Sequence, residues 1–117
     1  MKKIIYLIFF ASVFQTALFS QSYKDQNISI DERVADLLSK MTIEEKIGQM
    51  IMADYGSIQN NLSDIVTYRL GCVLFGGDSD PSSNTYREWA YICDTMQGYA
   101  QTSRLQIPLL IGADAVH

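Results

Sequence analysis

The sequence has few of the residues that form metal and disulfide sites. It contains two cysteines and one histidine in 117 residues. Without a Cys-x-x-Cys motif, a structural zinc site is not supported, and we expect no metal and no other cofactor. Cys72 lies in an apolar run and Cys93 on the apolar side of a helical pattern, positions typical of core thiols. We therefore predict two buried free thiols rather than a disulfide, although export would permit one.

Basic residues are also scarce. The 9 lysines and arginines face 13 acidic residues. Removing Lys2 and Lys3 with a leader leaves 7 basic residues and a net charge of −6. Because such a surface repels phosphate, nucleic acid is not expected as a partner.

The amino-terminal residues have the pattern of a secretory signal peptide. Met1-Lys2-Lys3 is followed by an apolar run over 4–19, and small polar residues follow at 20–22. We predict that residues 1–21 are removed and that the rest is exported, to the periplasm or outside the cell, without stable membrane insertion. An uncleaved anchor is the alternative, but Gln15 and Thr16 within the run disfavour it.

Helical patterns fill the first half of the remaining chain. Apolar residues at helical spacing predict a helix over 30–41. Thr42-Ile-Glu-Glu45 is a capping box that starts a second helix. The apolar residues 50–53 fit either the end of this helix or a short strand. A third helix is predicted from a cap at Ser63 to Leu70, with Gly71 as a left-handed stop.

Strands then alternate with one long helix. Cys72–Phe75 predicts a buried strand that ends in Gly76-Gly77, and Thr85-Tyr-Arg-Glu88 is a second capping box for a helix running past Ala100. Pro108 opens a final apolar strand. Alternating strands and helices indicate an α/β fold with a parallel sheet. Two or three strands cannot bury both sheet faces, so we expect residues 22–117 to be the truncated first part of a (β/α)8 TIM-barrel-like domain.

Asp114 follows the last predicted strand directly. Ligands in parallel α/β folds lie at the carboxyl ends of strands, so Asp114 is a candidate binding residue. Its alternative role is the cap of a following helix. The loop acids Asp78 and Asp80 are expected to be solvated.

Five segments, in order, resemble glycoside hydrolase family 3, specifically its secreted β-glucosidase and exo-glucanase branch. They are Asp31–Leu38, Met41–Met50, Arg69–Gly77, Glu88-Trp89 and Arg104–His117.

The resemblance implies a barrel domain and an enzyme that removes terminal β-linked glucose from non-reducing ends with retention. It places no catalytic residue in this chain, because both catalytic carboxylates lie further on. It implies that Asp114 binds the terminal glucose of a β-glucoside or β-glucan oligosaccharide and that His117 supports the pocket wall. Asp114-Ala-Val-His117 favours a glucosidase or xylosidase over a hexosaminidase, which usually has Asp-Gln-Glu-Gly there. A non-catalytic sugar-binding module and a membrane-tethered interaction protein are the alternatives from other classes.

Overall fold

The computed structural model describes residues 22–114. The predicted leader over 1–21 and His117 lie outside the described residues. The chain divides into two compact units between Ser39 and Lys40, and each is described by itself. None of the helices within 22–114 is long and apolar enough to cross a membrane.

The first unit consists of a short 3-10 helix, η1 (Ser22–Lys24), and nearly all of helix α2 (Ile30–Lys40). The backbone N–H of Tyr23 donates to the Asp36 carboxylate at 2.9 Å, and Arg33 Nε donates to the Tyr23 carbonyl at 2.8 Å. These bonds fasten η1 to α2. The predicted helix is confirmed, with Ile30 and Val34 of its apolar stripe exposed.

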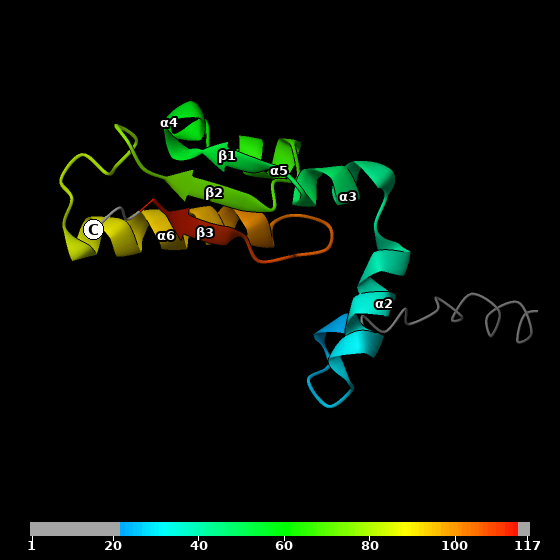
Figure 1. Cartoon of the computed structure of the whole chain (residues 1–117). Helices are drawn as coiled ribbons and strands as arrows, with labels where there is room; N and C mark the ends of the chain where they lie inside the picture. Colours follow the sequence, from blue (N-terminus) through cyan, green and yellow to red (C-terminus); the bar gives the residue numbers. More distant parts are fainter. Residues whose placement is uncertain (1–21, 115–117) are drawn as a thin grey trace, which may run out of the picture. The chain divides into compact units, whose positions relative to one another are not determined.

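The second unit contains a three-stranded parallel sheet in the order β1-β2-β3, and the three arrows run in the same direction in Figure 1. The predicted α/β class is confirmed, whereas the eight-stranded barrel stays a prediction. In chain order the elements are α3 (Ile43–Gln49), β1 (Met52–Asp54), α4 (Tyr55–Ile58), α5 (Asp64–Thr67), β2 (Cys72–Phe75), α6 (Tyr86–Gln101) and β3 (Leu110–Ala113).

The first predicted capping box is confirmed. The Glu45 backbone N–H donates to the Thr42 hydroxyl at 3.2 Å, and the Thr42 N–H donates to the Glu45 carboxylate at 2.9 Å. The second box is only half formed. The Glu88 N–H donates to the Thr85 hydroxyl at 3.3 Å, but the Glu88 carboxylate accepts from Ser83 Oγ at 3.1 Å.

The predicted cap of α5 is formed only in part, and the predicted end of the helix is wrong. Ser63 is the N-cap residue, as predicted, but its side chain makes no capping bond, and its hydroxyl donates to the Asn61 side chain at 2.7 Å instead. The helix ends at Thr67, and the left-handed residue after it is Arg69, with φ 57°, rather than Gly71. Gly71 serves close packing instead, since a Cβ there would lie 2.1 Å from the Gln49 carbonyl oxygen.

Residues 50–53, which fitted a helix end or a strand, lead into strand β1 at Met52. The four-residue helix α4 follows at once and was not predicted, because one turn is too short to show a period. Asp54 is its N-cap and accepts from the Ser57 N–H at 3.1 Å.

One face of the sheet is packed and the other is open. Val73 and Phe75 of β2 are buried, and the core they share includes Met96 of α6. Met52, Cys72 and Leu110 are in register on the opposite face, where Met52 and Leu110 are exposed. Cys72 and Cys93 are free thiols, but both are half-buried rather than buried as predicted. Among the described residues of the second unit, the helices therefore cover the Val73 side and leave the Met52 side open.

Candidate functional site

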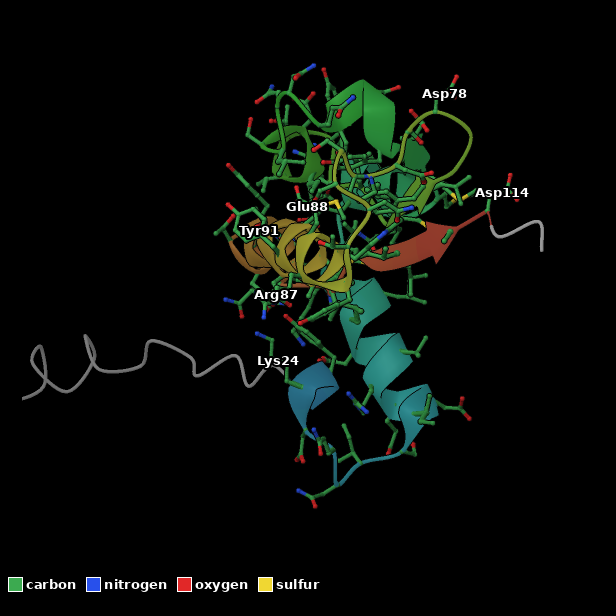
Figure 2. The ribbon with its side chains drawn as sticks, turned by 90° about the vertical axis from the view of Figure 1, so that its left-hand side faces the viewer. Lys24, Asp78, Arg87, Glu88, Tyr91 and Asp114 are labelled. Atoms are coloured by element: carbon green, nitrogen blue, oxygen red, sulfur yellow. The ribbon has the colours of Figure 1, made fainter. Side chains whose placement is uncertain are left out.

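Asp114 lies at the carboxyl end of β3, as the sequence predicted. Its backbone N–H donates to the Phe75 carbonyl at 2.7 Å, so the hydrogen bonding between β2 and β3 continues one residue beyond β3. The Asp114 side chain is exposed and projects from the tip of the strand (Figure 2). The carboxylate is thus held on a strand end and is accessible to a ligand.

Gly76 makes room for Asp114. A Cβ at position 76 would lie 2.6 Å from the Asp114 Cβ, so only glycine fits beside this aspartate. The turn is closed by Ser79, whose hydroxyl donates to the Gly76 carbonyl at 2.6 Å. Gly77 follows in the left-handed region with φ 61°, which glycine adopts without strain. The glycine pair, predicted as a tight turn, therefore also shapes the edge where Asp114 lies.

Asp54 ends strand β1 on the same face, level with Gly112 two residues before Asp114, and sequence reasoning missed it. Like Asp114, it is the first polar residue after an apolar run, and that shared pattern could have identified it. Its side chain is exposed and accepts one backbone bond from Ser57. The carboxyl edge of the sheet therefore presents two exposed carboxylates rather than one.

Three aromatic rings support this edge from the packed face. Tyr55 and Phe75 stack with centroids 4.4 Å apart, and Phe75 and Trp89 lie 4.7 Å apart. Burial raises the pKa of the Tyr55 hydroxyl, and the negative charge of Glu88 adds to that shift. Trp89 Nε1 donates to Asn84 Oδ1 at 2.8 Å, which fastens the loop after β2. Trp89 packs against the core, so it is not an open platform for stacking a sugar.

The predicted loop acids Asp78 and Asp80 are both exposed. Figure 2 shows Asp78 on the loop, away from the tip of β3. Within residues 22–114 no group of three or more metal-ligating side chains is placed to hold an ion.

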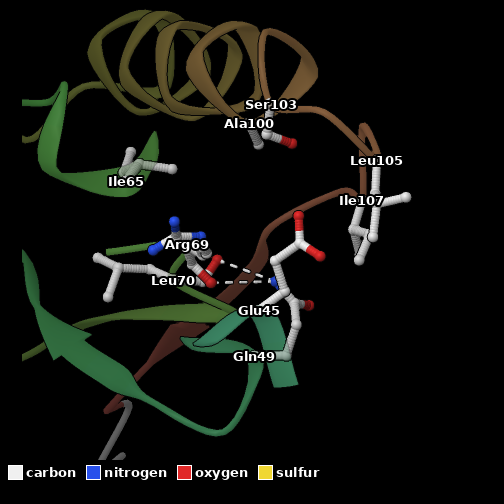
Figure 3. A pocket seen from close by; sticks show the side chains of 9 residues that line it. All are labelled: Glu45, Gln49, Ile65, Arg69, Leu70, Ala100, Ser103, Leu105 and Ile107. Atoms are coloured by element: carbon white, nitrogen blue, oxygen red, sulfur yellow. Dashed lines mark hydrogen bonds between the residues drawn. The ribbon is translucent and has the colours of Figure 1, made fainter. Parts of the chain in front are cut away.

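A separate pocket lies at the opposite, amino-terminal end of the strands (Figure 3). Its wall includes Gln49, whose amide donates to the Arg69 carbonyl at 3.2 Å. Glu45 also lines it and binds Arg104, whose Nε donates to the Glu45 carboxylate at 3.0 Å. The bond from Arg104 is the main reason that the pKa of Glu45 is lowered. The polar groups of Gln49, Glu45 and Arg104 thus bond to other parts of the protein and connect α3 to the segments before β2 and β3. We therefore place the candidate site at the carboxyl edge of the sheet.

Comparison with known proteins shows which proteins the chain resembles. No protein-family model matches the chain. It is 37% identical over 106 residues to the "Probable beta-glucosidase C" of Aspergillus oryzae and 36% identical over 106 residues to that of Aspergillus flavus. It is 33% identical over 101 residues to the "Beta-glucosidase C" of Emericella nidulans.

The chain resembles β-glucosidases. Each match covers 81% of the chain, so the resemblance inferred from the five segments is confirmed at that level. The chain spans only 16% of the length of these relatives. The exposed carboxylates at the sheet edge suit a ligand rich in hydroxyl groups, because an ionised carboxylate accepts strong hydroxyl bonds.

Proposed function

We propose that the chain is the first part of a family 3 glycoside hydrolase barrel domain. The complete protein would be an exported, retaining and exo-acting β-glucosidase. Identity of 37% to a protein named as a β-glucosidase carries this proposal. The parallel sheet supports it, because further strands and helices could extend the sheet from the exposed edge of β3 and close it into a barrel.

In this proposal Asp114 binds hydroxyls of the terminal glucose and does not take part in bond cleavage. Its support is the place of Asp114 at a parallel strand end, where ligands of this fold class bind. A retaining glycosidase needs a nucleophilic carboxylate and a carboxylic acid about 5–5.5 Å apart. By the family resemblance, both groups lie beyond this chain.

The experiment compares the full-length protein with the isolated 117-residue chain. We expect the full-length protein to hydrolyse p-nitrophenyl β-glucoside with retained configuration. The isolated chain should neither hydrolyse it nor unfold cooperatively, because it lacks the catalytic pair and leaves strand edges unpaired. Turnover by the isolated chain, abolished by a point mutation within it, would contradict the proposal.

A parallel assay with p-nitrophenyl β-xyloside separates the second candidate, a β-xylosidase of the same family. Faster hydrolysis of the xyloside would replace β-glucosidase by β-xylosidase. A full-length protein that binds glucose but cleaves neither compound would favour a non-catalytic sugar-binding module.

A further inference from the structure

We infer that Asp54 is a second hydroxyl-binding residue of the same site and helps to set its specificity for a polyhydroxylated ring. This inference rests on the proposed function, but it assigns a role to a residue on a different strand from Asp114. Three features of the sheet carry it: the face on which Asp54 lies, the residues between Asp54 and Asp114 on that face, and the way the Asp54 side chain is held.

Strand register puts both aspartates on the open face. Asp54 pairs with Leu74, which pairs with Gly112 two residues before Asp114. Side chains two apart on a strand point to the same face, so Asp114 shares the face of Gly112, Leu74 and Asp54. The packed core takes the alternate residues, including Val73. Asp54 and Asp114 therefore both belong to the face that the helices leave open.

Leu74 and Gly76 lie between the two aspartates on this face, Leu74 in register with Asp54 and Gly76 beside Asp114. Gly112 and Gly76 lie on this same face, on β3 and at the end of β2, respectively. A Cβ at Gly112 would approach Leu74 Cδ1 to 3.2 Å, so the Leu74 side chain lies over Gly112, and a Cβ at Gly76 would overlap Asp114. Glycine within a strand often marks a place where a ligand approaches the backbone. Adjacent strands lie about 4.8 Å apart and successive residues about 3.3 Å apart along a strand, so two strand spacings and the two-residue offset separate the backbones of the aspartates by about 12 Å. A single sugar ring, hydrogen-bonded at both ends, can bridge that span.

The Asp54 carboxylate is already oriented. Its Oδ2 accepts from the Ser57 N–H at 3.1 Å, as the N-cap of α4. One oxygen thereby fixes the side chain, and the other can accept a ligand hydroxyl without a change of rotamer. Such preorganisation lowers the entropic cost of binding.

The test is Asp54→Asn in the full-length protein. Asparagine caps helices as well as aspartate does, so the cap should persist while the charge is lost. We expect kcat/KM for p-nitrophenyl β-glucoside to fall roughly tenfold or more and the inhibition constant for glucose to rise, with Tm unchanged. Asp78→Asn, at an exposed loop aspartate, is the matched control and should leave all three quantities at wild-type values.

If Asp54 is only a helix cap, Asp54→Asn will match wild type and Asp54→Ala will lower Tm alone. That pattern, with an active wild type, would overturn the inference and leave the proposed function intact. A full-length wild-type protein without glycosidase activity would overturn both. We expect that added Ca²⁺ restores activity to neither Asp54→Asn nor Asp54→Ala. If the wild-type activity requires Ca²⁺ and Asp54→Asn loses this requirement, Asp54 is a cation ligand, and the inference is overturned.

Discussion

The two faces of the small sheet differ in what covers them. On β2, Val73 and Phe75 are 0% and 1% exposed beneath the helices. On the opposite face, Met52 and Leu110 are 59% and 71% exposed, and the site candidates Asp54 and Asp114 lie at the end of that face. The packed face holds the unit together, and the open face carries the ligand-binding candidates. In a barrel the open face would be the interior, so its apolar residues would be buried by later strands.

The largest effect is expected on the packed face. Phe75→Ala removes a side chain that contacts Tyr55 and Trp89 in the core. We expect it to destabilise the full-length protein by about 3–5 kcal/mol, because truncation of a buried aromatic residue leaves a cavity. Thermal unfolding of the purified protein measures the loss.

Leu110→Ala is the matching change on the open face. If a barrel covers this face, the variant should destabilise the full-length protein by about 2–5 kcal/mol. A change within about 0.5 kcal/mol would show that Leu110 remains exposed and would contradict the barrel.

A smaller effect is expected from the bond between α3 and the segment before β3. The pKa of Glu45 is lowered from its ordinary value of 4.5, chiefly by the hydrogen bond from Arg104. A lowered folded-state pKa stabilises the protein above the unfolded value, and the stabilisation is lost as the pH falls through the folded pKa. Glu45→Gln should therefore destabilise the protein by about 1–2 kcal/mol at pH 7 and weaken the dependence of stability on pH below about 4.5. Glu44→Gln, at the exposed neighbour, should have a smaller effect on the acid limb of the curve.

Gly76→Ala tests how closely the two strand ends must approach. The added Cβ would lie 2.6 Å from the Asp114 Cβ, so Asp114 must shift. We expect about a tenfold loss of kcat/KM, roughly 1.4 kcal/mol of transition-state binding. In Gly77→Ala nothing lies within 4 Å of the added Cβ, but φ is 61°. Gly77→Ala should lower the stability by about 1 kcal/mol and leave kcat/KM near the wild-type value. Equal losses of kcat/KM in Gly76→Ala and Gly77→Ala would contradict the specific role of Gly76.

The smallest effect has the opposite sign. Gly98 lies within α6, and a Cβ there would meet nothing within 4 Å. Gly98→Ala should stabilise the protein by about 0.5–1 kcal/mol, because alanine has the higher helix propensity. A lower Tm would mean that another part of the full-length protein packs closely against this point of α6.

Helices and strands could be predicted from the sequence where their apolar spacing or capping residues lie within one continuous segment. Apolar residues at helical spacing identified α2 and α6 correctly. The capping box of Thr42 and Glu45 correctly identified the start of α3. The strand β2 and the position of Asp114 followed from unbroken apolar runs.

The rest depended on contacts between residues far apart in the chain. Gly71 was predicted as a helix stop, but its role is to let the backbone approach Gln49, which only the folded chain shows. Asp54 was missed because the run before it was too short to distinguish a strand from a helix end. The partners of Arg104 could not be predicted either, since Glu45 is 59 residues away.

The role of Asp114 is tested most directly by measuring kcat/KM for p-nitrophenyl β-glucoside in the full-length wild type, Asp114→Asn and Asp114→Ala, with Tm for each. If the carboxylate binds the terminal glucose, Asp114→Ala should lower kcat/KM at least about a hundredfold, roughly 2.7 kcal/mol, with little change in Tm. Asp114→Asn should lie between alanine and wild type, because it keeps the shape and loses the charge. If Asp114 only caps a helix, asparagine will match wild type and alanine will cost about 1 kcal/mol of stability. A near-normal kcat/KM in Asp114→Ala would contradict the substrate-binding role.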